Sequence, residues 1–341
     1  MKLDLKYLKR VAGGLDLEKI DGYLDAVKEK NGKPKAAILA DMTNCLVRYG
    51  AGFNDYIIFE FYNMNAKQRD TYMTRLRNKK FNLAMNSREH SDVFNLKNQF
   101  YAVFADLLGR AFLDLGKCTD EELGAFLLRR PEIIAKPNGG ECGAGIEKLR
   151  KVDFAAMEDA VRYLRDPAKN FGVVEDVLYQ HEKMSELYPH SVNCLRMCTL
   201  VVNGEAHYLY AVLKTGNHGK FVDNLENGGY ACHVDLEKGV VIGPGHTSGR
   251  EIREIHEATG VAFRGFEIPY AREAIELVKK AALYVPDVRY VGWDVAILPD
   301  GPVLIEGNDY TAYDFPQLPD DSVARFGLVG QLRKLLPDYK F

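Results

Sequence analysis

Ionisable side chains inside two apolar strands constrain this fold more than any other feature of the sequence. The stretch YVGWDVAILPDGPVLIEGNDY, residues 290–310, predicts an antiparallel hairpin that turns at Pro299-Asp300-Gly301. Its first strand contains Asp294, and its second strand ends in Glu306-Gly307-Asn308. A buried carboxylate is costly unless a cation compensates its charge. The hairpin therefore predicts a sheet that brings these side chains to a positively charged partner.

Asp294, Glu306 and Asn308 form a candidate magnesium site. Mg²⁺ takes carboxylate and amide oxygens in combination with phosphate oxygens. Glu306 and Asn308 are two residues apart, so they share one face of their strand. Asp294 faces Glu306 only if the connection adds an odd offset, through a three-residue loop or a bulge, because a strict two-residue turn puts them on opposite faces. The alternative is two acidic strand ends that lie in water.

A glycine cluster after a short apolar run is a candidate phosphate-binding loop. Residues 133–136 predict a strand, and the segment IIAKPNGGECGAGI continues through Gly139, Gly140 and Gly143. Glycines let backbone N–H groups approach phosphates closely, and Lys136 adds a cation at the end of the strand. The spacing matches neither a Walker motif nor GxGxxG. A plain glycine turn is the alternative interpretation.

The segment NFGVVEDVLYQHEKM is a candidate adenine site. A strand that ends in Glu175-Asp176-Val177-Leu178 could offer backbone groups to the edge of the base, while Glu182 could reach the ribose hydroxyls. An ordinary passage from strand to loop is the alternative.

Arg196 lies in the predicted strand SVNCLRMCTLVV, where a buried arginine requires an anionic partner. A structural salt bridge is one interpretation. The other is contact with a transferring phosphate or a substrate carboxylate, which the planar guanidinium suits. A polar string after the next strand, from Lys214 through His218 to Asp223, is a candidate substrate loop or a solvated hairpin end.

Composition excludes several classes of function. The formal net charge of −3 leaves no basic surplus, so we expect no general nucleic-acid binding. The six cysteines form no CxxC pair, which predicts reduced thiols and a cytoplasmic protein. The segment MKLDLKYLKR does not resemble a signal peptide, and no apolar run approaches the roughly 18 residues of a membrane helix. The absence of HExxH and GxSxG disfavours a zinc site and an α/β-hydrolase.

A chain of 341 residues exceeds what one core usually needs, so we expect two or three lobes. Roughly the first 90 residues predict short helices, and their aromatic segment 54–76 predicts buried packing. A longer helix is predicted over 96–115, with Gly116 at its end. Asn203-Gly204 predicts a hairpin, and the apolar stripe of 271–285 predicts a helix. The fold class is α+β, with a helical region, a small lobe and a large lobe at 1–95, 96–175 and 176–341.

The ordered set of these segments resembles the ATP-grasp superfamily, and within it the sugar-transfer-associated or α-L-glutamate-ligase-related group. The resemblance extends over residues 52–317, and its most specific parts are SVNCLR, FVDNLENGG and GWDVAILPDGPVLIEGN. It implies an ATP-grasp fold, in which two α+β lobes clasp Mg-ATP beside the helical N-terminal region.

The resemblance also implies roles for individual residues. Lys136 matches the second of two lysines that contact the nucleotide phosphates. Lys97 resembles the first, although family members often carry Asp or Asn where this chain has Leu96. Residues 175–178 would form the adenine hinge, and Glu182 would bind the ribose. The implied metal ligands are Asp294, Glu306 and Asn308.

By the same resemblance the activity is that of an ATP-dependent carboxylate–amine ligase, which forms an acyl phosphate on a small-molecule or glycan-linked acid. Lys136 and Arg196 would neutralise the charge of the phosphates and of this acyl phosphate. An alternative is a kinase that phosphorylates a hydroxyl of a small molecule or sugar, with Asp223 or His218 as general base. A third alternative is a non-catalytic nucleotide-binding module, which would have no reason to keep all these residues. The sequence is compatible with a homo-oligomer.

Overall fold

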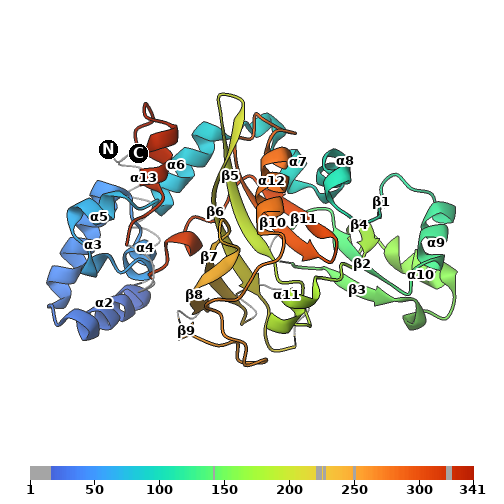
Figure 1. Cartoon of the computed structure of the whole chain (residues 1–341), viewed down its shortest axis with the longest axis horizontal. Coiled ribbons are helices and arrows are strands. Elements are labelled where there is room, and N and C mark those ends of the chain that lie inside the picture. The colour runs from blue at the N-terminus through green and yellow to red at the C-terminus, as the bar shows by residue number, and fades with distance from the viewer. Residues whose placement is uncertain (1–16, 141–142, 220–224, 226–227, 249–250, 320–324) are drawn as a thin grey trace. The chain divides into compact units, whose positions relative to one another are not determined.

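The computed structural model describes residues 17–140, 143–219, 225, 228–248, 251–319 and 325–341. The chain divides into two compact units, of which the first combines residues 1–84 with 312–341 and the second is 85–311 (Figure 1). Among the described residues, no helix has the length and apolar character needed to cross a membrane.

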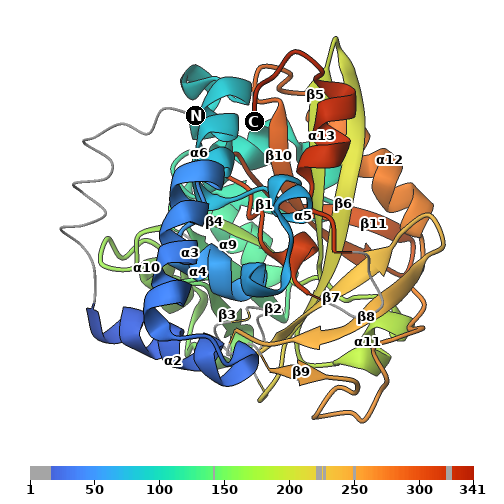
Figure 2. The ribbon, with the colours of Figure 1, turned by 90° about the vertical axis from the view of Figure 1, so that its left-hand side faces the viewer.

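The first unit is helical, and its helices α2, α3 and α4 lie side by side (Figure 2). Its helices are α2 (Leu17–Asn31), α3 (Lys35–Tyr49), α4 (Phe53–Ile58), α5 (Ala66–Asp70), most of α6 (Arg75–Met85) and α13 (Val329–Leu335), with 3-10 turns η1 (Phe61–Asn63) and η6 (Phe315–Gln317). The predicted aromatic packing is confirmed, because Phe59, Phe61 and Tyr72 are buried in one core. The ring centroid of Phe59 lies 5.0 Å from that of Tyr72.

The side chain of Gln317 explains why the C-terminal segment belongs to the first unit. Its Oε1 accepts a hydrogen bond from the backbone N–H of Met73 at 2.8 Å. Its Nε2 donates to the carbonyl oxygens of Met73 and Tyr313 at 2.9 and 2.7 Å. The predicted large lobe of 176–341 is therefore corrected at its end, because residues 312–341 pack with the helical region.

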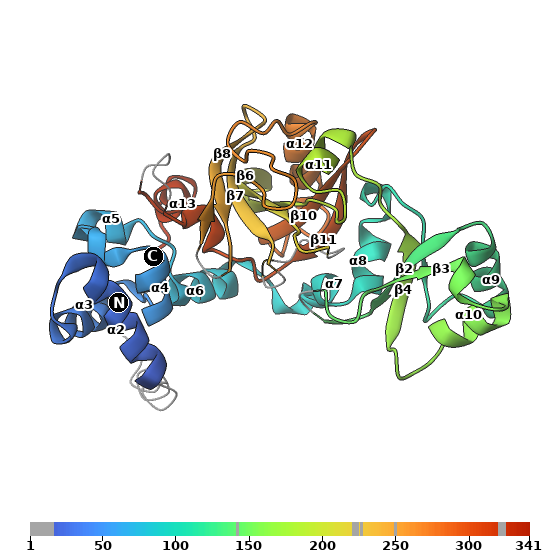
Figure 3. The same cartoon turned by 90° about the horizontal axis from the view of Figure 1, so that it is seen from below.

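The second unit contains two antiparallel sheets. The four-stranded sheet has the order β1-β4-β2-β3, and the helices α9 and α10 lie on one of its faces (Figure 3). In sequence order, the elements from residue 88 to residue 176 are η2 (Arg88–His90), α7 (Asp92–Asn95), α8 (Lys97–Val103), η3 (Ala105–Leu107), β1 (Phe112–Asp114), α9 (Asp120–Leu128), β2 (Glu132–Pro137), β3 (Glu147–Arg150), η4 (Lys151–Asp153), α10 (Met157–Leu164) and β4 (Phe171–Asp176). The strand predicted over 133–136 is β2, and the strand predicted to end in residues 175–178 is β4, which ends at Asp176.

The helix predicted over 96–115 is wrong, because α8 ends at Val103 and a strand follows. Gly109 has a φ of +60°, and a Cβ there would collide with the side chain of Val303. The chain turns at this glycine, and Phe112 then pairs with Glu175 of β4. Sheet pairing therefore overrides the apolar periodicity of this segment.

The seven-stranded sheet has the order β11-β10-β5-β6-β7-β8-β9. Its elements are α11 (Glu182–Leu187), β5 (Leu195–Val202), β6 (Glu205–Thr215), β7 (Tyr230–Asp235), β8 (Val240–His246), β9 (Ile252–Arg253), α12 (Ala271–Ala282), β10 (Tyr290–Leu298) and β11 (Gly301–Asn308). Both predicted hairpins are confirmed, and Asn203 and Gly204 take the positive φ values, 52° and 80°, that a tight hairpin turn requires. Helix α12 is the predicted amphipathic helix.

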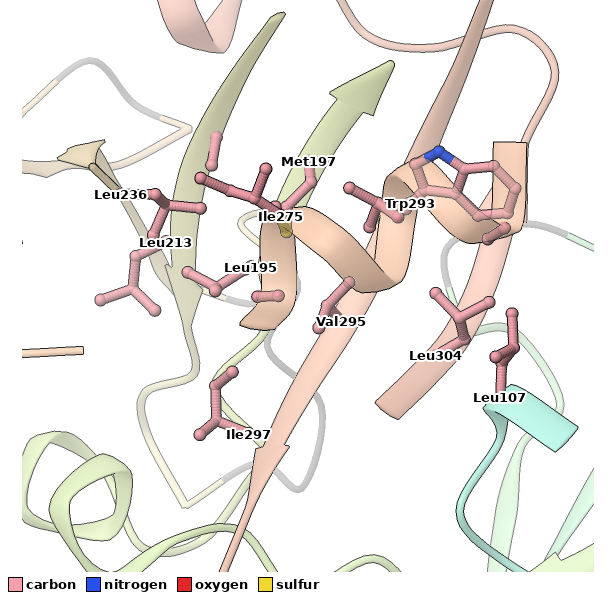
Figure 4. Close-up of a cluster of buried hydrophobic side chains, with 14 of the residues drawn as sticks. Leu107, Leu195, Met197, Leu213, Leu236, Ile275, Trp293, Val295, Ile297 and Leu304 are labelled. Atoms are coloured by element: carbon pink, nitrogen blue, oxygen red, sulfur yellow. The ribbon is translucent and has the colours of Figure 1, made fainter. Parts of the chain in front are cut away.

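One face of this sheet contributes to a hydrophobic core, and α12 packs against that face. Trp293, Val295 and Ile297 of β10 belong to this core, and so does Ile275 of α12 (Figure 4). Successive side chains of a strand alternate between faces. Asp294 therefore lies on the opposite face, which carries the candidate site.

Candidate functional site

A β-bulge in β11 brings the two acidic residues together. The turn between the strands has only two residues, since Leu298 pairs with Gly301. Val295 pairs with Leu304, but Asp294 pairs with Glu306, so Ile305 is the extra residue of the bulge. The offset that the sequence requires thus comes from a bulge, and Leu304 faces the core while Glu306 faces away from it.

Asp294 is a buried carboxylate held by two cations. Arg196 lies directly opposite it on β5 and donates to its two oxygens over 2.5 and 3.0 Å. Lys214 of β6 donates to Oδ2 over 3.4 Å. Burial favours the neutral acid, but Arg196 and Lys214 outweigh it and hold the pKa of Asp294 well below its ordinary value.

Glu306 and Asn308 share the face of Asp294. Glu306 is half-buried and has no ion-pair partner within the described part of the chain. The Nδ2 atom of Asn308 is buried and likewise lacks a hydrogen-bond partner among the described residues. An unsatisfied buried amide is costly unless water or a ligand pairs with it.

A second buried carboxylate, Glu175 of β4, is also held by two cations. Lys136 Nζ lies 2.6 Å from its Oε1, and Arg110 Nε lies 2.7 Å from its Oε2. The hydroxyl of Tyr101 donates to the same Oε2 and accepts from Lys136 at 3.1 Å. Burial raises the pKa of Glu175, but Lys136 and Arg110 outweigh it and lower the pKa to about 2.

Lys97 begins α8 next to the glycine loop. Its backbone N–H donates to the carbonyl of Asn138 at 2.8 Å, and its Nζ donates to the carbonyl of Gly140 at 3.4 Å. Burial lowers the pKa of Lys97, and the charge of Glu306 opposes this effect. The charge of Lys97 therefore interacts with that of Glu306 on the large sheet.

Two described glycines of the loop adopt backbone conformations that favour glycine. Gly140 and Gly143 have φ values of 120° and 73°, which disfavour residues with a Cβ. Open space surrounds the Cβ positions of Gly139 and Gly140.

The four residues predicted to form the adenine hinge, 175–178, have different surroundings. Glu175 faces Lys136, whereas Asp176 forms an ion pair with Arg130. Val177 and Leu178 follow β4 as half-buried chain without regular structure.

Glu182 is exposed at the start of α11 and lines a hollow of about 540 Å³. The other residues around this hollow include Lys183, Glu186, Lys238 and Glu267, and none of the hinge residues 175–178 lies among them. The structure thus brings Glu175 to Lys136 but places Glu182 on a different surface feature.

The two candidate general bases of the kinase alternative are His218 and Asp223, which follow β6 in the sequence. His218 is exposed and has a φ of 53°. Asp223 lies outside the described residues.

Sequence reasoning missed two residues of these clusters, Arg110 and Tyr101, and it also missed the pairing of Lys214 with Asp294. Arg110 and Tyr101 carried no signal, because both fell within the helix predicted over 96–115. Within the described ranges, no group of three or more His, Cys, Asp or Glu side chains could hold a metal ion. A metal site here would combine two carboxylates and an amide with ligands from a substrate.

The chain belongs to the family of sugar-transfer associated ATP-grasp proteins, whose sequence model matches residues 76–333. This match includes both buried carboxylates and their cations. Comparison with curated proteins gives no match.

Solved structures of ATP-grasp ligases are similar to this chain at low identity. The ligase PsnB, complexed with minimal precursor, Mg and ADP, is 16% identical with a TM-score of 0.39, and the match covers 72% of this chain and 61% of that chain. A complex of PsnB with minimal precursor is 16% identical with a TM-score of 0.45, covering 80% and 71% of the two chains. An L-amino acid ligase from Bacillus licheniformis is 16% identical with a TM-score of 0.34, covering 64% and 41%. The chain thus spans less than two thirds of the length of the first of these structures.

Proposed function

We propose that this protein is an ATP-dependent carboxylate–amine ligase that binds Mg-ATP and activates a small-molecule or glycan-linked acid. The observation that carries the proposal is the direct pairing of Asp294 with Glu306, next to Arg196, on the face of the large sheet opposite Trp293 and Val295. Membership of the ATP-grasp family supports it.

The donor set fits Mg²⁺ in type. Asp294, Glu306 and Asn308 supply two carboxylates and an amide on one face, and Asn308 has a buried amide without a partner among the described residues. These three residues would hold Mg²⁺, which would neutralise charge on the phosphates. Amide nitrogen and oxygen exchange places by rotation, so the oxygen of Asn308 can face the metal.

The cations fit a polyphosphate. Glu175 is paired with two cations, so its cluster carries an excess of positive charge, and Asp294 is likewise held by two cations. Buried excess charge is expensive, and an anionic ligand would compensate it. Lys136 and Lys97 would contact the phosphates from the small lobe, and Arg196 would contact them from the large sheet.

The same residues suit acyl transfer. A carboxylate must approach the γ-phosphate against charge repulsion, and Arg196 with Lys214 lies where cations reduce this repulsion. Attack by the carboxylate oxygen on the γ-phosphorus would release ADP and form the acyl phosphate. The amine would then displace inorganic phosphate. Closure of the glycine loop around Gly140 would exclude water from this intermediate.

³¹P NMR of the protein with Mg-ATP and pooled amino acids, uronic acids, sugars and polyols tests the proposal. We expect ADP and inorganic phosphate only when both an acid and an amine are present. A new phosphate-ester signal with little free phosphate would show a kinase instead and would overturn the ligase assignment. No ATP turnover with any pool would leave only nucleotide binding, and would also overturn it.

A matched pair of variants assigns the turnover to the site. Asp294→Asn removes the charge of the paired carboxylate and should abolish turnover. Asp235, at the end of β7, forms an ion pair with Lys238 at the surface. Asp235→Asn makes the same change there and should leave turnover unchanged.

A further inference from the structure

Arg110 is a buried arginine whose side chain contacts both the bulge of β11 and the small lobe. Its Nη1 donates to the carbonyl of Leu304 at 2.7 Å, and its Nη2 donates to the carbonyl of Ile305 at 3.3 Å. These are the two residues that precede Glu306, and Ile305 is the bulged residue. A bulge interrupts the ladder of hydrogen bonds, so its carbonyls need other donors.

The remaining donors of Arg110 are also used. Nη1 donates to the carbonyl of Leu108 at 2.9 Å, Nη2 donates to the hydroxyl of Tyr101 at 2.9 Å, and Nε donates to Glu175 at 2.7 Å. All five N–H groups of the guanidinium therefore have acceptors. The side chain is 1% exposed, so these contacts lie away from water.

One hydrogen-bonded chain thus joins the two candidate clusters. It runs from Lys136 through Glu175 and Arg110 to the backbone that immediately precedes Glu306. Lysine cannot replace arginine in this chain, because its single nitrogen cannot reach a carboxylate and two separate carbonyls in fixed directions.

We propose that Arg110 is a positioning residue, which fixes the bulge so that Glu306 faces Asp294 and thereby couples the metal site to the phosphate-binding Lys136. The inference rests on the proposed Mg-ATP site, but Arg110 itself contacts neither metal nor nucleotide in it. Removing residues that orient metal ligands typically lowers metal affinity by about 10- to 100-fold. The effect of Arg110 should therefore fall on metal-dependent binding.

Two variants separate the charge of Arg110 from the hydrogen-bonding geometry of its guanidinium: Arg110→Lys keeps the charge, and Arg110→Met removes it. Lysine keeps a cation beside Glu175, and methionine leaves Glu175 paired with Lys136, so neither variant leaves a buried carboxylate without a counter-charge. Arg165→Lys is the matched control. Arg165 also binds a carboxylate and two backbone carbonyls, but all of its partners lie within residues 115–120.

Calorimetric titration with a non-hydrolysable ATP analogue, with Mg²⁺ and with EDTA, gives the first readout. For both Arg110 variants we expect metal-free affinity within about twofold of the wild type and a roughly tenfold smaller gain in affinity from Mg²⁺. Arg165→Lys should keep the full gain. An unchanged gain in Arg110→Lys, or an equal loss with and without metal, would overturn the inference.

Hydrogen exchange of the amides of residues 301–308 gives a readout that needs no ligand. Release of the bulge carbonyls should speed exchange in both Arg110 variants but not in Arg165→Lys. Unchanged exchange would overturn the proposal that Arg110 fixes the bulge. A wild type that binds the analogue equally with Mg²⁺ and with EDTA would overturn the Mg-ATP proposal and the coupling with it. Faster exchange in the variants would still establish that Arg110 fixes the bulge, so the two failures are distinguishable.

Discussion

Glu175→Gln tests how far one buried charge determines the stability of the second unit. The carboxylate is 3% exposed and lies 2.6 Å from Lys136 and 2.7 Å from Arg110. Although burial raises its pKa, these two cations lower it from the ordinary 4.5 to about 2. Each tenfold change in a proton-binding constant corresponds to about 1.4 kcal/mol, so the charge contributes about 3 kcal/mol to the free energy of unfolding at neutral pH.

We expect Glu175→Gln to lower the free energy of unfolding by about 3 kcal/mol at pH 7, since the amide leaves two buried cations without their counter-charge. The folded-state pKa lies below the unfolded value, so the wild type holds this contribution above about pH 4.5 and loses it as the pH falls toward 2. About 2 kcal/mol of it is lost by pH 3. The difference between variant and wild type should therefore shrink to about 1 kcal/mol at pH 3.

Urea unfolding followed by the fluorescence of Trp293 measures these differences. Trp293 is the single tryptophan of the chain and lies buried in the second unit, so its signal reports on that unit. Glu147→Gln is the control, because Glu147 also binds a lysine and a tyrosine but is 31% exposed, and it should cost less than about 1 kcal/mol. A Glu175→Gln difference that stays constant from pH 7 to pH 3, or that equals the Glu147→Gln difference, would refute the reasoning.

Three further outcomes are expected. Asp294→Asn and Glu306→Gln should each abolish ATP turnover while the circular dichroism spectrum stays native, and full activity in either variant would exclude the metal assignment. Lys136→Ala should weaken ATP binding roughly tenfold in calorimetry, because it removes a charged donor, and an unchanged affinity would count against its contact with phosphate. Mn²⁺ alone should bind more weakly than Mn²⁺ with an ATP analogue, because Arg196 occupies both oxygens of Asp294; equal affinities by electron paramagnetic resonance would contradict this.

Local chemistry made much of the fold predictable. Asn203 and Gly204 can take the positive φ values of a tight turn, so the hairpin of β5 and β6 was recognisable from two residues. The apolar stripe of 271–285 required a helix with one buried face, and α12 provides it. Asp294 was identifiable as a site residue because a carboxylate inside an apolar strand needs a partner.

The missed features depend on contacts between distant segments. The sequence required an odd offset between Asp294 and Glu306, but no residue type near Ile305 specifies a bulge. The carbonyls of this bulge are satisfied by Arg110, which lies 195 residues earlier in the chain. The role of Arg110 was not predictable either, because the apolar pattern of 96–115 suggested a helix. The strand around Phe112 forms only by pairing with β4. Such pairings are tertiary choices that local patterns leave open.

The unequal environments of the two facing carboxylates bear on how the site would fill. Glu306 has no ion-pair partner within the described residues, whereas Arg196 and Lys214 hold both oxygens of Asp294. For Asp294 to coordinate a metal, we expect Arg196 and Lys214 to pair with other anions. Phosphate oxygens are the anions that a nucleotide would supply. Each ligand would then lower the cost of binding the other, and by linkage the effect is the same in both directions. An ion-pair exchange of this kind would keep the buried charges compensated before and after binding of the proposed Mg-ATP.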